Sequence, residues 1–269
     1  MGQRVDIKPK QSLGQNFLVD DNIARNIVRD LQLHENDVVV EIGPGTGALT
    51  AHLVGHVRHL VVVEIDGRVV DDLQRRFESR VVILHQDFLE TDLGALQNRF
   101  QQKLRIVGNI PYHLTSPILF KVFETFSAVR DLTMMIQREV AQRIVAQPGS
   151  KKYGILSVFS RFYGIPKLFF HVSPNCFYPK PKVTSSVIHI DLHEQLPYVV
   201  NNELFQHVVK ASFGKRRKTL RNSLTFLPYE EAMVEKALSA IDFPLEKRPE
   251  DLSLEKFVQL TRLLEQHLA

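Results

Sequence analysis

Apolar positions along the first two-thirds of the chain follow two different periods. Short runs of β-branched and aliphatic residues, typical of buried strands, alternate with longer stretches in which apolar residues recur at helical spacing. The predicted strands are residues 38–42, 60–65, 81–84, 104–107, 132–136, 155–162 and 187–192, and the predicted helices are residues 48–57, 67–78 and 117–126. Such alternation specifies an α/β fold, a parallel sheet with helices on both faces.

The pattern changes after about residue 196. Residues 203–213, 229–240 and 253–267 predict helices, and no strand run lies between them. The intervening stretches contain Pro228, Pro244 and Pro249, which separate the helices. We therefore expect an α/β domain over residues 1–196 and a small all-helical domain over residues 197–269.

The composition narrows the class of protein. Cys176 is the only cysteine, which excludes an internal disulfide and a cysteine-based metal site and is typical of a reducing compartment. No apolar run approaches the ~18 residues of a membrane-spanning helix, and the N-terminus lacks the apolar stretch of a signal peptide. We expect a cytoplasmic protein with no membrane partner. Since no feature demands an oligomer, we expect a monomer.

Basic and acidic residues are segregated along the chain, although the net charge is only +4. Residues 140–190 contain no acid and seven basic residues, and residues 204–229 contain no acid and six. The second stretch includes Lys215, Arg216, Arg217, Lys218 and Arg221. This separation favours a side that faces a polyanion, with phosphate contacts from the second stretch; a solvated basic face is the alternative.

A glycine-rich turn joins the first predicted strand to the next helix, with the sequence Glu41-Ile-Gly43-Pro-Gly45-Thr-Gly47-Ala48. Glycines let the backbone approach a ligand closely, and a helix N-terminus offers free N–H groups. Gly43 and Gly45 are therefore candidate cofactor-binding residues. The spacing also satisfies the dinucleotide fingerprint, so a nicotinamide dehydrogenase stays open here, as does a turn without a ligand.

Acidic residues end three successive predicted strands, at Glu41, Glu64 and Asp87. In an open parallel sheet these positions meet at the carboxyl edge, where ligands bind. Glu64 can accept hydrogen bonds from both hydroxyls of a ribose, whereas a pyrophosphate would be repelled by this concentration of negative charge. S-adenosylmethionine suits the edge better, because it combines a ribose, an adenine amine and a cationic centre.

The tetrapeptide Asn109-Ile110-Pro111-Tyr112 follows the fourth predicted strand. The exocyclic amine of adenine is a poor nucleophile because its lone pair is delocalised into the ring. The Asn109 side-chain oxygen and the Ile110 carbonyl, directed by Pro111, can accept both N–H bonds of that amine and aim its lone pair at a methyl group. Tyr112 can stack on a base swung out of its helix. Taken alone, the tetrapeptide is also compatible with a turn that buries its tyrosine.

Together these motifs resemble the KsgA/RsmA family of ribosomal RNA adenine N6,N6-dimethyltransferases. The resemblance covers nearly the whole chain and extends to Gln11–Leu18, Gln86–Leu89, Phe177–Val183, Phe213–Asn222 and Arg248–Leu252. It implies a Rossmann-like methyltransferase domain that uses S-adenosylmethionine, followed by a small helical RNA-binding domain. The implied reaction adds two methyl groups to each of two adjacent adenosines in the 3′-terminal hairpin loop of 16S rRNA, within the small ribosomal subunit, as part of subunit biogenesis.

The resemblance also implies roles for individual residues. Asn16 and Leu18 close over the cofactor, Gly43 lies against its methionine part, Glu64 holds the ribose, Asp87 holds the adenine amine, and Asn109 touches both cofactor and target. Phe177 is implied to lie on the face of the target base opposite Tyr112. A position in the buried core is the alternative for the Phe177 ring.

Two other functions are compatible with parts of the sequence. A resistance-type enzyme that methylates an adenosine of large-subunit RNA is an alternative, although residues 215–222 favour the small-subunit family. A non-catalytic RNA-binding assembly factor would keep the fold, but the intact tetrapeptide at 109–112 argues against it. His52, His56 and His59 lack the neighbouring glutamate and the further ligand of a metal site, so we expect no metal.

Overall fold

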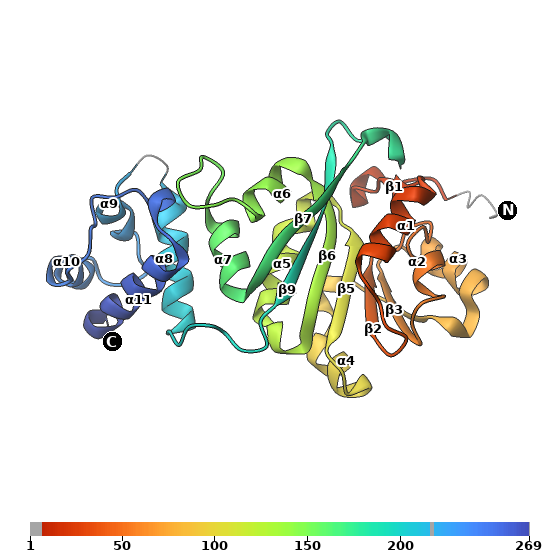
Figure 1. Ribbon diagram of the computed structural model, residues 1–269, viewed down its shortest axis with the longest axis horizontal. Coiled ribbons are helices and arrows are strands. Elements are labelled where there is room, and N and C mark those ends of the chain that lie inside the picture. The colour runs from red at the N-terminus through yellow and green to blue at the C-terminus, as the bar shows by residue number, and fades with distance from the viewer. Residues whose placement is uncertain (1–6, 216–217, 269) are drawn as a thin grey trace. The chain divides into compact units, whose positions relative to one another are not determined.

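The computed structural model describes residues 7–215 and 218–268 of the chain (Figure 1). Its strands are β1 (Phe17–Leu18), β2 (Val38–Ile42), β3 (His59–Glu64), β4 (Val82–His85), β5 (Leu104–Asn109), β6 (Val129–Gln137), β7 (Gly164–Val172), β8 (Phe177–Tyr178) and β9 (Ser185–Leu192). Its helices are α1 (Asp21–Asp30), α2 (Thr50–Leu53), α3 (Gly67–Phe77), α4 (Leu93–Phe100), α5 (Thr115–Glu124), α6 (Arg138–Ile144), α7 (Ile155–Tyr163), α8 (Asn202–Gly214), α9 (Leu220–Leu224), α10 (Glu231–Ala240) and α11 (Leu254–Leu268).

Seven strands form one sheet in the order β4-β3-β2-β5-β6-β9-β7. The pairs β2–β3, β2–β5, β3–β4 and β5–β6 are parallel, whereas β9 runs antiparallel to β6. The predicted α/β class is confirmed. Because the strand order reverses direction at β2, the loops that follow β2 and β5 diverge and leave room for a ligand at the carboxyl edge.

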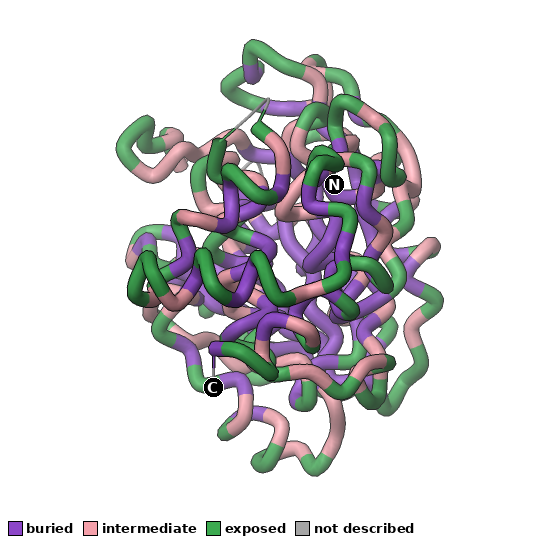
Figure 2. Tube along the Cα trace, turned by 90° about the vertical axis from the view of Figure 1, so that its left-hand side faces the viewer, coloured by how far each residue is buried: buried purple, intermediate pink, exposed green. Residues whose placement is uncertain are grey.

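Each strand of the sheet centre contributes apolar side chains to both faces, because successive side chains of a strand point in opposite directions. Val39, Val62 and Val107 belong to the core cluster formed with α1, α2 and α3 on one face. Helices α4 and α5 cover the other face (Figure 1). Buried and exposed turns alternate along the helices in Figure 2, as amphipathic helices require.

The prediction of a strand at residues 155–162 is wrong, because the structure forms helix α7 there. The segment is rich in aromatic residues, which favour strands, although its polar residues Ser157, Ser160 and Arg161 recur at helical spacing. Gly154 and Ser157 supply the start signal: the Gly154 N–H donates to Ser157 Oγ at 3.1 Å.

Strands β1, β7 and β8 and helices α6 and α9 lie outside the predicted set, as do the two helices α1 and α4. Both helices begin at an aspartate cap that the sequence displays: Asp20 accepts from the N–H groups of Asn22 and Ile23, and Asp92 accepts from that of Ala95. Strand β7 contains Pro166 and lies at the end of the sheet order, where a missing N–H donor is tolerated.

The chain divides into two compact units. The first contains residues up to Ala141 together with Ile165–Glu194, and the second contains Gln142–Gly164 together with Gln195–Ala269. The residue 196/197 boundary expected from the sequence lies two residues from the second crossing point, but segment 142–164 groups with the C-terminal helices. Aromatic packing explains this grouping, because the ring of Phe162 stacks on that of Phe205 with centroids 4.3 Å apart. Among the helices described, none is long and apolar enough to span a membrane.

Candidate active site

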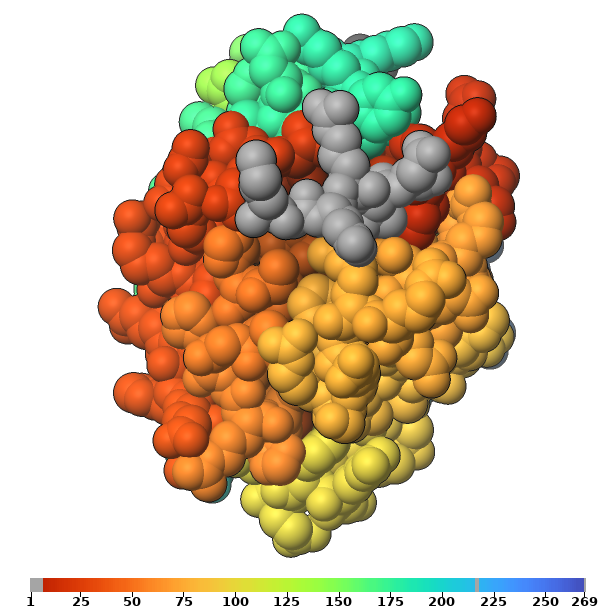
Figure 3. Space-filling view, turned by 90° about the vertical axis from the view of Figure 1, so that its right-hand side faces the viewer, coloured from red at the N-terminus to blue at the C-terminus, as the bar shows by residue number. Residues whose placement is uncertain are grey.

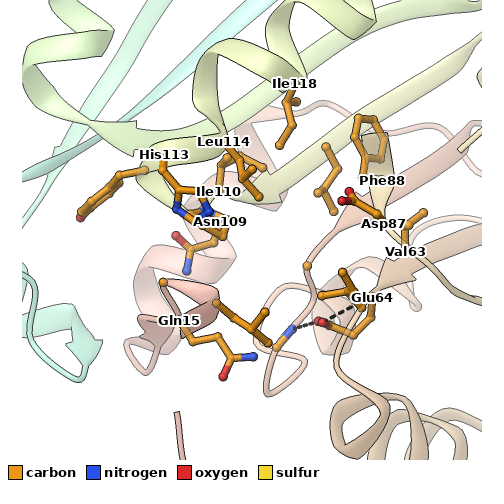
Figure 4. A pocket seen from close by; sticks show the side chains of 18 of the residues that line it. Gln15, Val63, Glu64, Asp87, Phe88, Asn109, Ile110, His113, Leu114 and Ile118 are labelled. Atoms are coloured by element: carbon orange, nitrogen blue, oxygen red, sulfur yellow. Dashed lines mark hydrogen bonds between the residues drawn. The ribbon is translucent and has the colours of Figure 1, made fainter. Parts of the chain in front are cut away.

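A cavity of about 230 Å³ opens at the carboxyl edge of the sheet, within the first unit. Its walls come from the N-terminal segment 12–17, the glycine turn after β2, the ends of β3 and β4, and residues 109–114 after β5. Figure 4 shows Glu64 and Asp87 on one side of this cavity and Asn109 on the other. The structure thus brings together six of the seven predicted cofactor-binding residues, namely Asn16, Gly43, Gly45, Glu64, Asp87 and Asn109.

The glycine turn owes its shape to backbone conformations that other residues rarely adopt. Gly43 and Gly45 have φ angles of 57° and 54°. A Cβ atom at Gly45 would lie 2.8 Å from Cδ1 of Phe17, so no side chain fits there. A Cβ atom at Gly43 would meet nothing within 4 Å, because Gly43 faces the open cavity. The turn therefore exposes its backbone to a ligand.

Glu64 stands at the end of β3 with its carboxylate held in place. Its Oε1 accepts from the N–H groups of Ile65 and Asp66, each at 2.9 Å, and its Oε2 accepts from Gly45 N–H at 3.4 Å (Figure 4). Burial raises the pKa of this carboxyl above its ordinary value, and the backbone hydrogen bonds oppose that shift. A carboxylate so oriented at the cavity wall suits a pair of ribose hydroxyls.

Asp87 lies directly after β4 and caps a short 3-10 turn, because its Oδ1 accepts from Leu89 N–H at 2.8 Å. The apolar side chains of Ile65, Phe88 and Ile118 line the cavity beside it. A flat ring whose edge carries an amine fits this arrangement, since the ring would contact the apolar residues and the amine would donate to the carboxylate.

The side-chain amide of Asn109 is oriented by the N-terminal segment. Its Nδ2 donates to the backbone carbonyl of Asn16 at 2.8 Å. If the amide were flipped, Asn109 Oδ1 would lie 2.8 Å from the Asn16 carbonyl oxygen, and two acceptors would face each other. The hydrogen bond therefore assigns the nitrogen to this position. The Ile110 N–H donates to Met135 O at 3.1 Å, which fixes the backbone on the other side of Asn109. Asn109 Oδ1 is thereby left for a different donor.

Tyr112 is half-buried at the cavity wall, and its hydroxyl shares a hydrogen bond of 2.9 Å with Ser185 Oγ. Burial raises the pKa of the Tyr112 phenol, so the hydroxyl is neutral. Ser185 begins β9 and is buried. Sequence reasoning missed this partner, since the two residues are 73 positions apart and no local signal joins them.

The N-terminal segment is tied over the cavity by Asp66, another residue that sequence reasoning missed. Asp66 Oδ1 lies 3.4 Å from Lys10 Nζ, and Asp66 Oδ2 accepts from Gln15 Nε2 at 3.2 Å. Arg68 donates to both carboxylate oxygens and also to the Lys8 carbonyl. These contacts place the pKa of Asp66 well below its ordinary value, chiefly through the Arg68 hydrogen bonds. We call residues 8–17 the strap.

Two residues predicted to lie at the ligand site, the acid Glu41 and the apolar Leu18, do not line the main cavity. Glu41 shares a strand face with Val39 and points beneath α2, where Thr50 Oγ1 donates to Glu41 Oε2 at 2.7 Å. Leu18 is buried in the core and borders a separate cavity of about 20 Å³ below the glycine turn, together with Glu41 and Gly43. Only Glu64 and Asp87 of the three strand-end acids therefore face the main cavity.

Phe177 does not present a free ring, which corrects its predicted stacking on a base. Its side chain is 5% exposed and belongs to the core cluster, so the buried alternative is the one that the structure shows. The reason is strand pairing: Phe177 lies opposite Leu18 in the two-stranded β1–β8 sheet, with its side chain on the core side.

The predicted basic cluster lies in the second unit, and Arg216 and Arg217 fall outside the described residues. Lys215 and Lys218 are exposed, and Lys215 Nζ lies 5.1 Å from the centroid of the Phe226 ring. Arg221 Nη2 donates to Leu238 O, and Arg221 Nε lies 3.9 Å from Glu246 Oε1. Part of the Arg221 guanidinium is therefore engaged in contacts within the protein.

The three histidines set aside as metal ligands have other contacts. His52 bonds to Asp21 at 2.7 Å, and His56 bonds to the His52 carbonyl. Among the residues that the structure describes, the one set of three ligand residues close enough to share an ion is Asp131, His189 and Asp191. Arg105 already pairs with Asp131, Lys167 with Asp191, and His189 bonds to Asp191, so this set is neutralised by the protein's own cations.

Comparisons with known proteins agree with this geometry. A family model described as ribosomal RNA adenine dimethylase matches residues 7–265. Ribosomal RNA small subunit methyltransferase A of Francisella tularensis is 40% identical over 259 residues, 96% of this chain and 98% of that protein. A dimethyladenosine transferase from Plasmodium falciparum has a similar fold, with a TM-score of 0.79, 22% identity and coverage of 93% of this chain and 98% of its own. The 23S rRNA methyltransferase ErmE gives a TM-score of 0.67 at 24% identity, covering 93% and 100%.

Proposed function

Since the chain belongs to the ribosomal RNA adenine dimethylase family, we propose that it dimethylates the N6 amines of two adjacent adenosines in the 3′-terminal hairpin loop of 16S rRNA. One observation supports this most directly. A single cavity collects the two carboxylates suited to ribose and adenine, Glu64 and Asp87, with the amine-binding residues of the 109–112 tetrapeptide. The backbone at Gly43, which no side chain covers, also faces this cavity.

The residues present fit S-adenosylmethionine as the methyl donor. Glu64 would hold the ribose hydroxyls, Asp87 the adenine amine, and the open backbone at Gly43 would lie against the methionine part. The bound cofactor supplies a methyl group on a cationic sulfur. Asn16 in the strap would cover it, as the wall positions of the strap indicate.

Asn109 prepares the target amine for attack. Because Nδ2 donates to the Asn16 carbonyl, Oδ1 can accept one N–H bond of the adenine amine, and the Ile110 carbonyl can accept the other. Two acceptors pull the nitrogen toward a tetrahedral geometry and localise its lone pair. Pro111 fixes the direction of the Ile110 carbonyl and contributes no N–H of its own. This activation uses oriented acceptors, and we assign no step to a metal ion.

Tyr112 would stack on the extruded adenine. Its hydroxyl is held by Ser185, which leaves the ring face as the part available for a ligand. A planar ring against the target base supports the unstacked state that the reaction needs. We further propose that Lys215, Lys218 and Arg221 contact RNA phosphates, and that the protein acts as a monomer on small subunits in the cytoplasm.

Transfer of labelled methyl groups to unmethylated small ribosomal subunits tests this function. We expect incorporation of four methyl groups per subunit into the 3′-terminal hairpin of 16S rRNA, with none into large subunits. Incorporation into large-subunit RNA alone would favour the resistance-type activity. Binding to small subunits without any transfer would favour a non-catalytic assembly factor.

A further inference from the structure

Tyr178 is an exposed aromatic residue next to a buried one. Strand β8 consists of Phe177 and Tyr178, and alternation along the strand turns the two rings to opposite sides. Phe177 is 5% exposed, whereas Tyr178 is 64% exposed. Of the aromatic side chains that the structure describes, only Tyr178 and Phe226 stand out as large exposed hydrophobic groups, and Phe226 already faces Lys215.

Two links place Tyr178 at the rim of the candidate active site. Tyr178 pairs with Phe17 in the β1–β8 register, and Phe17 lines the cofactor cavity. At the other end of the same loop, Ser185 holds the hydroxyl of Tyr112. Figure 3 shows the teal segment that includes β8 bordering the red N-terminal segment. Residues 178–183, which we call the rim loop, therefore run beside the site.

The charge of the rim loop indicates the chemistry of its partner. Lys180 and Lys182 are both exposed, and Val183 adds an apolar side chain that is 43% exposed. No acid occurs between residues 140 and 190, so these lysines have no carboxylate close to them in the chain. An exposed ring followed in the chain by two exposed cations fits an unpaired nucleotide, which offers a base to stack on and a phosphate to neutralise.

We propose that the rim loop binds an unpaired RNA nucleotide that flanks the target adenosine. Tyr178 stacks on the base of that nucleotide, and Lys180 and Lys182 contact the adjoining phosphates. The proposal rests on the proposed function, because it names how the same site recognises its RNA. It gives Tyr178 the task that the sequence alone suggested for the neighbouring Phe177, on a flanking base instead of the target.

Binding of the isolated 3′-terminal hairpin RNA to full-length variants tests this proposal. Tyr178→Ala should weaken RNA binding by about 5- to 150-fold, the range expected on loss of one base–aromatic stack. Tyr178→Phe keeps the ring and should bind within about twofold of the parent. Affinity for S-adenosylmethionine should be the same in all three proteins.

The double variant Lys180→Ala/Lys182→Ala should lower the slope of log affinity against log salt by about 1.5. Arg29→Ala/Arg75→Ala is the matched control. It removes two exposed cations from α1 and α3, and should leave that slope unchanged.

Parent-level RNA affinity of Tyr178→Ala would overturn the proposal, as would equal losses in Tyr178→Phe and Tyr178→Ala. A Tyr178→Ala protein that binds the naked hairpin normally but fails on whole subunits would point to a ribosomal protein as the partner, which also overturns it. If Tyr178→Ala does not fold, the lysine pair decides through its salt slope. Failure of the proposed function is seen separately, in a parent protein that transfers no methyl groups.

Discussion

Asn109 shows how one hydrogen bond decides the use of a side chain. Its Nδ2 donates to the Asn16 carbonyl, so Oδ1 is the atom that can accept from the adenine amine in the proposed reaction. Asn109→Ala should lower kcat by about 100- to 1000-fold, the usual cost of removing one preorganised polar group from a transition state. RNA affinity should change little, because the interaction strengthens mainly during the reaction.

Asn109→Asp provides the sharper comparison. A carboxylate keeps one acceptor but sets its second oxygen against the Asn16 carbonyl, so this variant should be at least as slow as Asn109→Ala. Single-turnover methylation of hairpin RNA measures both. A fast aspartate variant would contradict the assigned orientation of the amide.

Tyr112 and Ser185 should behave as a unit. Tyr112→Phe keeps the stacking ring but leaves the buried Ser185 hydroxyl without its partner, so we expect mild kinetic change and a loss of about 1 kcal/mol in stability. Adding Ser185→Ala to Tyr112→Phe should restore part of that loss. Tyr112→Ala should be severe in RNA methylation. Urea unfolding of the parent, Tyr112→Phe, Ser185→Ala and the double variant measures the stability changes, and methyl transfer at fixed RNA concentration measures the kinetic ones. Strictly additive stability changes would argue against the pair.

Glu41 gives a pH dependence to stability. Burial raises its pKa from 4.5 to about 8, against the hydrogen bond from Thr50. Between these two values the folded protein binds a proton that the unfolded chain does not, so stability contributed by this group falls as pH rises through that window. The glutamine side chain of Glu41→Gln is neutral at every pH, so this variant does not lose stability through that titration. Its free energy of unfolding relative to the parent should therefore rise between pH 5 and pH 8 in urea titrations, and a constant difference would contradict the shift.

At the scale of elements, the strap and the loop after β3 are joined through Asp66. Asp66 both caps α3 and holds Lys10 and Gln15 of the strap, whose Asn16 carbonyl orients Asn109. In the proposed complex, the coverage of the cofactor and the orientation of the Asn109 amide therefore depend on the same carboxylate.

Asp66→Asn should weaken S-adenosylmethionine binding by about 1 kcal/mol, roughly fivefold, because charge-assisted contacts to the strap are lost while an acceptor for the helix cap remains. The strap should also become more sensitive to protease. Asp92→Asn, at the cap of α4, is the matched control and should change neither property. Calorimetric titration and limited proteolysis measure the two effects, and equal behaviour of both variants would separate Asp66 from the strap.

At the scale of the whole molecule, we expect the separation of charge along the chain to set how RNA is held. Lys215 and Lys218 are exposed in the second unit, whereas Arg221 is partly committed to Leu238. Lys215→Ala/Lys218→Ala should flatten the salt dependence of small-subunit binding by about 1.5 units, at ~0.7–0.9 for each phosphate contact. Arg221→Ala should cost stability as well. Cofactor affinity should not change, and an unaltered salt slope would show a solvated face.

Much of the fold and site follows from local sequence. Runs of β-branched residues, helical spacing of apolar residues and the glycine turn are local signals, and they predict the α/β class because each depends on neighbours within a few residues. Glu64, Asp87 and Asn109 could be placed in one site because parallel strands end at a common edge. Helix α7 was predicted as a strand because its aromatic residues favour strands, although Ser157, Ser160 and Arg161 recur at helical spacing.

Contacts between distant segments depended on tertiary structure. The strand order, the antiparallel entry of β9, the Tyr112–Ser185 bond and the attachment of the strap to Asp66 each join residues separated by dozens of positions. The register of the β1–β8 pair likewise decided which side chain of β8 faces the core, so that Phe177 is buried and Tyr178 is exposed. The sequence by itself determined which chemical groups this protein carries and which end of the sheet they occupy. Only the folded chain decided which atoms of those groups remain unoccupied and therefore available to a ligand, because that depends on partners brought together by packing.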